Sequence, residues 1–395
     1  MNRYLKINLL LLCVVLTYSC ADSGKKTSVH VNRDGQKLYT MQELPCKTFN
    51  MDENTSQIVD FFQPFIIDGT LRFTMHSRTA VRQCILVFDI STGNVIDSIP
   101  LYKQGPNAIS GNFQGYYIHN MDSVYFFSHF EQNLFLVNRQ GEVISKINLA
   151  EQFIREDNSK IVPSYPFPGI DTPIRKLNST LILQGTGRFN DNPKDPVLNV
   201  TALYNLTDTT LKFANSYPEI YGDPNNIGNQ WGFFGYLKVA YDLNGNGEMV
   251  LSYPADDHIA VYDIAANTSR RYFAGYSKKD IIRTISESDK DEAFQYLENT
   301  RYGNIHYDSY RNLYYRFVQH PLYDYDTRDR NTYKKDLSII ILDSEFNKVG
   351  EYDLKEKPWM SNNAFVSEEG LHIQTLSDDD DFMKFISLKP TRIND

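Results

Sequence analysis

Short apolar runs alternate with polar turns along nearly the whole chain. Six times, two or three apolar residues lead into Asp, Asn or Ser and then into a polar turn. The copies reach this polar residue at Asp89, Asn138, Asn205, Asp263, Asp343 and Ser387. An Asp or Asn side chain can accept a hydrogen bond from the backbone two residues on, so each copy predicts a tight turn between two strands.

A second turn signal precedes each copy. Asp68-Gly69 and Asp122-Ser123 each lead into an apolar run, and comparable turns precede residues 181, 249, 313 and 371. Each unit then holds four strands in two consecutive hairpins, which is the blade of a β-propeller. Six units predict an all-β, six-bladed β-propeller that forms a single domain over residues 37–395. A β-sandwich or a pair of small β domains is the weaker alternative, since neither requires one unit to return six times.

The last unit has no clear fourth strand before the chain ends, whereas Lys37 to Phe49 reads as an extra β segment ahead of the first unit. We expect this segment to pair with the strand near Met383 to Leu388 and close the ring, because an open propeller leaves two unpaired edges. Short helices are expected in one inter-blade link, after Ser277 and Ser288, where capping residues precede apolar residues at helical spacing.

Composition indicates a folded chain without a nucleic-acid partner. The 395 residues are 41% hydrophobic and carry a formal charge of −9. A duplex-binding protein needs a basic stripe that displaces phosphate counterions, and no run of Lys or Arg here exceeds two residues. The charge therefore favours other classes of partner.

The N-terminus predicts export. Arg3 and Lys6 flank the start of an apolar run, Ile7 to Leu16, which is too short to span a bilayer. We assign residues 1–19 to a signal peptide and residues 20–36 to a polar tether. The segment from Leu16 to Cys20 resembles the lipobox of bacterial lipoproteins, so Cys20 is the expected lipidation residue. The protein is expected on the outer membrane, at its periplasmic or surface face, with soluble secretion as the alternative.

Two further cysteines lie beyond this leader. Cys46 and Cys84 would meet an oxidising compartment, but no feature of the sequence brings them together. We expect two buried thiols without a disulfide.

Several features together resemble a known family. They are the lipobox, the chain length, the six degenerate units and the run Lys103-Gln104-Gly105-Pro106-Asn107 after the outer strand of the first unit. The chain is similar in these respects to the uncharacterised six-bladed propeller lipoproteins of Gram-negative gut bacteria, domain-of-unknown-function family 4221. The resemblance covers nearly the whole chain and implies a fold and a location, with no activity to transfer.

Candidate binding residues lie in the long links between units, which propeller topology gathers on one face. The link between the third and fourth units is rich in aromatic and amide residues, notably Tyr221, Asn229, Gln230, Trp231 and Tyr236. Aromatic rings stack on apolar faces of ligands, and amides both donate and accept hydrogen bonds. This segment predicts recognition of a glycan, a peptide or a partner protein of the envelope. The alternative is that the same rings pack the link against the blades.

Metal and catalytic signals are weak. His76 and His129 hold equivalent places after the second strand of the first two units, and two imidazoles could help to bind zinc if a third ligand came from segment 256–258 or from His320. No Gly-x-Ser-x-Gly elbow, His-Glu-x-x-His motif or P-loop occurs. The sequence therefore predicts a non-enzymatic binding module without a cofactor. A metal-dependent hydrolase or lactonase with its site at the propeller axis is the alternative.

Overall fold

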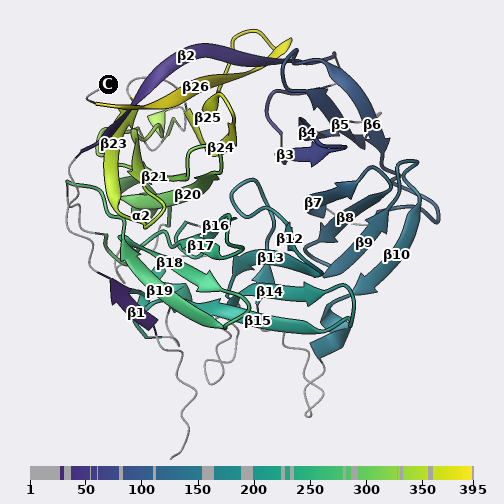
Figure 1. Ribbon diagram of the computed structural model, residues 1–395, viewed down its shortest axis with the longest axis horizontal. Coiled ribbons are helices and arrows are strands. Elements are labelled where there is room, and N and C mark those ends of the chain that lie inside the picture. The colour runs from purple at the N-terminus through teal and green to yellow at the C-terminus, as the bar shows by residue number, and fades with distance from the viewer. Residues whose placement is uncertain are drawn as a thin grey trace, which may run out of the picture.

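The computed structural model describes most of the chain from residue 37 onward, together with residues 27–30 inside the predicted tether. The described residues are 27–30, 37–53, 55–59, 61–79, 83–109, 113–153, 164–187, 199–223, 227–231, 235–278, 282–285, 292–326, 328–329, 332–354 and 359–393. Their sheets stand side by side around a ring (Figure 1). The all-β prediction is confirmed. The predicted signal peptide and Cys20 lie outside the described residues.

Four of the sheets have the simple order of a propeller blade, in which consecutive strands pair antiparallel. The first contains β3 (Phe62–Ile67), β4 (Thr70–Arg78), β5 (Gln83–Asp89) and β6 (Val95–Pro100). The second contains β7 (Phe113–Asn120), β8 (Ser123–Ser128), β9 (Asn133–Val137) and β10 (Val143–Asn148). The third contains β11 (Tyr165–Pro166) and β12 (Arg175–Leu177), both paired with β13 (Thr180–Thr186), then β14 (Asn199–Asn205) and β15 (Leu211–Ser216). The fourth contains β16 (Ala240–Leu243), β17 (Met249–Ser252), β18 (His258–Asp263) and β19 (Thr268–Phe273), with β1 (Thr27–His30) parallel to β19.

The fifth sheet has eight strands and curls back on itself (Figure 1). In spatial order it contains β20 (Arg301–Asp308), β21 (Leu313–Gln319), β22 (Leu337–Leu342), β23 (Lys348–Leu354), β2 (Tyr39–Asn50), β26 (Phe382–Arg392), β25 (Gly370–Thr375) and β24 (Trp359–Ser367). The two end strands approach each other, and the Asn304 amide of β20 donates to the Asn362 carbonyl of β24 at 2.8 Å. The result is a nearly closed barrel.

The prediction of six separate blades is therefore wrong. The last two predicted units share one sheet, because β2 pairs with β26 and also, through Tyr39 and Gly350, with β23. Gly350 permits this join, since an added Cβ would lie 2.5 Å from the Tyr39 carbonyl oxygen. The ring consists of four blade-like sheets and one near-closed eight-stranded barrel.

The predicted pairing of the N-terminal segment is confirmed. Strand β2 runs antiparallel to β26, with Leu44 opposite Ser387 and Asn50 opposite Phe382. Its Phe49 is fully buried and stacks on Phe73 of the first sheet, with ring centroids 4.1 Å apart. One strand thus completes the barrel and packs the barrel against the first sheet.

The predicted turn chemistry is present in five of the six copies. At these five positions the side-chain Oδ1 accepts from backbone N–H groups two or more residues on: Asp89, Asn138, Asn205, Asp263 and Asp343. Ser387 differs, because it lies inside β26 and its hydroxyl meets His372 Nδ1 at 2.8 Å. The sixth unit therefore continues as a long strand where the others turn.

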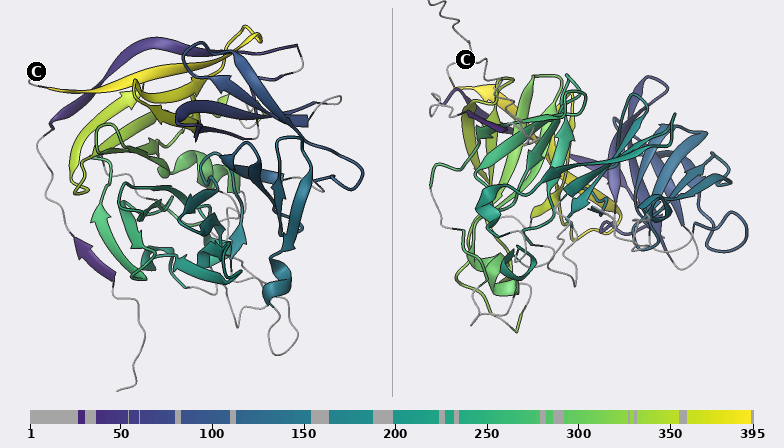
Figure 2. Two further views of the ribbon diagram at one scale, coloured as in Figure 1. Left: turned by 45° about the vertical axis from the view of Figure 1, so that its right-hand side comes forward. Right: turned by 90° about the horizontal axis from the view of Figure 1, so that it is seen from below.

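Helices are short. The helix expected after Ser288 is α2 (Glu292–Glu298), which projects from one face of the ring in the edge-on view (Figure 2). The helix expected after Ser277 is not seen in the described residues 277–278 and 282–285. The remaining helical pieces are α1 (Ile227–Trp231), η1 (Ala150–Phe153) and η2 (Glu219–Tyr221). In the described part of the chain, no helix is long and apolar enough to cross a membrane.

The two cysteines form no disulfide, as expected. Cys84 is buried in the first sheet, but Cys46 is exposed. The prediction of two buried thiols is correct only for Cys84, because Cys46 lies where the pairing of β2 with β26 shifts register, in a stretch of β2 without buried residues.

The segment 167–174, between β11 and β12, ties several sheets together. Pro168 packs closely on Gly115 of β7, where an added Cβ would lie 2.6 Å from the Pro168 Cβ. Ile170 packs against the cores of the first, second and fifth sheets. Asp171 forms an ion pair with Lys238, which precedes β16, at 2.5 Å.

Candidate functional site

A pocket of about 190 Å³ opens at one end of the eight-stranded barrel. We call it the mouth pocket, and its lining residues are Tyr296, Gln319, Tyr333, Lys334, Lys335, Leu337, Trp359, Met360, Ser361 and Leu376. They come from α2, from the ends of β21, β22 and β24, and from the connections after β21 and β25. Below the pocket, buried Phe317, Ile339 and Leu371 belong to the apolar core that fills the barrel. The core supports the pocket, and a barrel mouth is a common location for ligand sites.

One wall of the mouth pocket is a chain of polar side chains. Gln319 is only 2% exposed, and its amide oxygen accepts from the Tyr296 hydroxyl at 2.9 Å. Its amide nitrogen donates to the Ser361 hydroxyl oxygen at 2.5 Å. These contacts hold three side chains from β21, α2 and β24 in a set orientation. The Ser361 hydroxyl retains its own hydrogen as a donor.

Lys335 supplies an amine to the same pocket. Its Nζ donates to the carbonyl oxygens of Tyr296 and Asn299, each at 2.6 Å, and lies 4.9 Å from the Tyr296 ring centroid. Burial, helped by the nearby Arg301 charge, lowers the pKa of Lys335 to about 7. This amine therefore titrates near neutral pH, which an exposed lysine does not do.

The opposite wall is aromatic and apolar. Trp359 and Tyr333 are half-buried, and Met360 lies beside them. Leu376 is 43% exposed at the rim. Aromatic rings beside a few fixed polar groups are the usual composition of a site for a small polar ligand. The arrangement can bind and orient such a ligand.

None of the residues that line this pocket was predicted from the sequence to bind a ligand. Trp359 is one of two tryptophans and lies in the link between the fifth and sixth predicted units, and Lys335 lies in the basic pair Lys334-Lys335. A tryptophan in a link was a usable signal. Its proximity to Gln319 and Tyr296 was not predictable, because the fifth and sixth units were expected to be separate.

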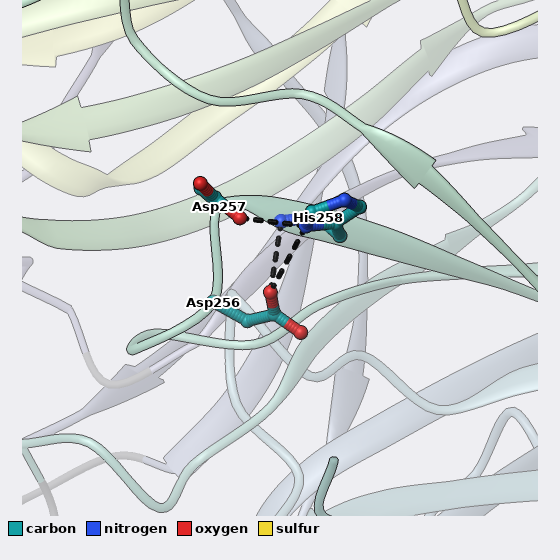
Figure 3. Close-up of side chains that lie close together, drawn as sticks. All are labelled: Asp256, Asp257 and His258. Atoms are coloured by element: carbon teal, nitrogen blue, oxygen red, sulfur yellow. Dashed lines mark hydrogen bonds and ion pairs between the residues drawn. The ribbon is translucent and has the colours of Figure 1, made fainter. Parts of the chain in front are cut away.

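A second cluster lies at the turn between β17 and β18 and contains Asp256, Asp257 and His258 (Figure 3). His258 Nδ1 lies 2.6 Å from Asp257 Oδ1 and 3.5 Å from Asp256 Oδ1. Asp256 is 1% exposed and also pairs with Arg271 of β19. The buried guanidinium of Arg316 donates to the Asp256 backbone carbonyl at 2.6 Å. The cluster is therefore a compact ion-pair network.

This cluster is better suited to ion pairing than to holding a metal. Hydrogen bonds to Asp256 and then to Asp257 raise the pKa of His258 to about 9. The two carboxylates thus favour the protonated imidazole, and a metal ion would have to displace that proton. Arg271 and Arg316 add positive charge around the same carboxylates. Within the described ranges, this is the single group of three His, Cys, Asp or Glu ligand atoms close enough to share an ion.

The zinc candidates His76 and His129 are not part of that group. His76 is 3% exposed, and burial lowers its pKa to about 3. His129 is 2% exposed, and its Nδ1 lies 2.8 Å from the Pro166 carbonyl oxygen. His320, considered as a third ligand, instead meets the Ser338 hydroxyl at 2.6 Å. The structure places all three as packed residues of separate sheets.

Three of the predicted binding residues are core residues. Tyr221 and Tyr236 are fully buried and Trp231 is 3% exposed. Trp231 Nε1 donates to the Tyr221 carbonyl at 3.0 Å, and the Tyr221 hydroxyl donates to the Tyr236 carbonyl at 2.8 Å. These contacts favour the packing alternative. Gln230 is half-buried and its backbone carbonyl accepts from Gln295; the side chain of Asn229 lies outside what the structure describes.

An arginine side chain joins three of the sheets. Arg175 of β12 donates to Gln63 of β3 at 3.1 Å and pairs with Asp242 of β16 at 3.4 Å. Asp242 also accepts from the Tyr307 backbone N–H of β20 at 3.0 Å. These contacts tie the sheets together.

Comparison with known proteins identifies the family. A family model described as a domain of unknown function, DUF4221, matches residues 69–353. A crystal structure of a DUF4221 member from Bacteroides vulgatus is 22% identical, with a TM-score of 0.75, and the match covers 91% of this chain and 100% of that one. A protein from Bacteroides fragilis described as exported is 9% identical, with a TM-score of 0.53, over 92% and 98% of the two chains. At these identities the likeness concerns the fold. No curated protein matches the sequence.

Proposed function

This chain belongs to the DUF4221 family, and from that premise we propose that it is a binding module of the cell envelope that recognises a glycan or peptide group in the mouth pocket. The single observation that carries the proposal is the pairing of an aromatic wall with the fixed Gln319–Ser361 polar wall. The pocket lies at a barrel end and is lined in part by Tyr296 of α2, the helix that projects from one face of the ring (Figure 2).

The chemistry of the pocket supports binding of a small polar group. Trp359 and Tyr333 offer flat surfaces that pack on the C–H face of a sugar or on an apolar side chain. Gln319, Ser361 and Lys335 offer hydrogen bonds at fixed positions. The volume of about 190 Å³ suits one residue of a longer chain. The hydrolase alternative gains no support from the described residues, where the one group of three close ligand atoms is the Asp256–Asp257–His258 cluster, in which Asp256 pairs with Arg271.

We also propose that the module is exported and anchored by lipid on Cys20. The support comes from the N-terminal pattern of charge, apolar run and cysteine. The similar Bacteroides fragilis protein is described as exported. Cys20→Ala should move the protein from the membrane fraction to the soluble fraction of the envelope, since a covalent lipid would be its anchor. If the variant remained membrane-bound, this part of the proposal would be wrong.

Binding is tested with the full mature chain on glycan and peptide arrays. Wild type should bind at least one probe class, and Trp359→Ala should lose that binding with little change in melting temperature, because Trp359 is only partly buried. Tyr323→Ala is the matched control, since Tyr323 is 75% exposed and does not line the pocket. Absence of any bound probe, or equal binding by Trp359→Ala, contradicts the proposal.

A further inference from the structure

Arg301 lies beside the mouth pocket as a buried cation. It is 6% exposed, and it faces Gln319 in the register of β20 and β21, so both side chains lie on the same side of the sheet. Gln319 lines the pocket, as does Leu337, which pairs with Gln319 on the other side. Arg301 is therefore in the row of side chains next to the pocket wall.

Few protein groups balance the positive charge of the Arg301 guanidinium. Its Nε donates to the Gly235 carbonyl at 2.5 Å, and among the described residues it forms no ion pair with a carboxylate. Gly303 lies on the same side of the sheet, and an added Cβ there would stand 3.9 Å from Arg301 Nη1. The absence of a side chain at Gly303 leaves space next to the terminal nitrogens.

Positive charge dominates this region. Arg301 lowers the pKa of Lys335, so the two cations interact. The nearby carboxylate, Asp171, is 8% exposed and is already paired with Lys238 at 2.5 Å. Lys238 and Arg301 thus share the Asp171 carboxylate. A buried charge is costly unless a counter-charge or hydrogen bonds satisfy it.

From this arrangement we propose that the mouth pocket selects a carboxylated sugar, whose carboxylate lies between Arg301 and Lys335. This inference rests on the proposed function and names its ligand class. The planar guanidinium can engage both carboxylate oxygens, while Lys335 contributes a point charge. A sugar is favoured over an acidic peptide because Trp359 and Tyr333 provide flat walls and Gln319 and Ser361 provide partners for ring hydroxyls.

Proton uptake should accompany binding. Burial and Arg301 hold the pKa of Lys335 at about 7, whereas the negative charge of a bound carboxylate raises this pKa. The other charged or titratable groups on the elements around this amine are Arg301, Tyr296 and Glu298 of α2, and the chain neighbours Tyr333, Lys334 and Asp336. Lys335→Met should abolish the proton uptake, which assigns the proton to Lys335.

The test uses D-glucuronate and D-glucose, which differ only at C6, with a glutamate-containing tripeptide as a third probe. Titration calorimetry at pH 8, in two buffers of different ionisation enthalpy, gives affinity and proton uptake. Wild type should prefer glucuronate to glucose at least tenfold and take up a fraction of a proton. Arg301→Gln and Lys335→Met should reduce glucuronate affinity at least tenfold and should reduce glucose affinity much less.

Controls keep the outcomes distinct. Arg328→Gln removes an arginine whose side chain is 88% exposed, outside the pocket, and should leave both affinities unchanged. Arg301→Lys retains the positive charge and replaces Arg301→Gln in the test if that variant does not fold. It should weaken glucuronate binding partially. Equal affinity for glucose and glucuronate overturns the anion inference but leaves the proposed function standing. Preference for the tripeptide overturns the sugar assignment, and binding of no probe here or on the arrays overturns the proposed function itself.

Discussion

Replacing Trp231 by Ala tests whether the link between the third and fourth sheets belongs to the core. Trp231 is 3% exposed and packs on Tyr221 and Tyr236, with ring centroids 5.1 Å and 5.6 Å away. Truncating a buried tryptophan costs about 3–5 kcal/mol of the free energy of unfolding. The Tyr221 carbonyl also loses its 3.0 Å hydrogen bond from Nε1, which contributes about 1 kcal/mol of that loss.

The expected shift can be measured by thermal and urea unfolding followed by circular dichroism. An unfolding entropy of roughly 0.7 kcal/mol/K, scaled to a chain of this size, converts this loss into a decrease in melting temperature of about 4–7 °C. Trp231→Phe retains most of the packing and should cost about 1–2 kcal/mol. Trp359→Ala is the matched tryptophan control and should shift the melting temperature much less, because Trp359 is half-buried.

A Trp231→Ala melting temperature within about 1 °C of wild type would refute this reasoning, given that each kcal/mol corresponds to more than a degree. Such a result would mean that the indole contributes no packing energy. The link would then again be a candidate ligand surface, because its tryptophan would not be needed for packing.

Three further predictions follow from particular contacts. Below pH 6.5 the His258 ion pairs stabilise the protein fully, and this stabilisation is lost as pH rises through about 9, so the stability of His258→Gln should depend less on pH over this range. Because the titration of Lys335 changes stability in the opposite direction, the measured quantity is the difference in the free energy of unfolding in urea between variant and wild type at each pH. Parallel stability curves for the two proteins would contradict the prediction. Gly350→Ala places a Cβ 2.5 Å from a β2 carbonyl and should cost about 1–3 kcal/mol, whereas Gly303→Ala meets nothing closer than 3.6 Å and should cost less; equal losses would contradict the strand-joining role. Phe49→Ala should cost about 3–5 kcal/mol in the same unfolding assay, because its ring lies among three buried phenylalanines, and a loss below about 1 kcal/mol would argue against β2 as a core strand.

Much of the local structure could be predicted from the sequence. The Asx turns at Asp89, Asn138 and Asp343 involve hydrogen bonds within a few residues, so composition and spacing alone identify them. The pairing of β2 with β26 was also predictable, because an extra strand at one end of the chain matched a missing strand at the other. The family resemblance followed from the same repeat pattern.

The candidate site could not be predicted in the same way. Its polar wall joins Tyr296, Gln319 and Ser361, which lie on three separate elements and meet only because the eight-stranded sheet curls. For the predicted aromatic site, the sequence could not separate binding from packing. Tyr221 and Trp231 have the composition of a ligand site, but burial depends on what covers them, and composition does not specify that.

The sequence by itself determined the strands, the turns and the all-β class, because hydrogen-bonding turns and apolar alternation act over a few residues. Only the tertiary structure decided how many sheets those strands form. The contact between Tyr39 and Gly350 merges two expected blades into one barrel, and it depends on a backbone approach between residues more than three hundred positions apart. The same long-range packing placed Arg301 and Lys335 beside one pocket, since side chains from distant segments acquire a shared environment only when the sheets close around them.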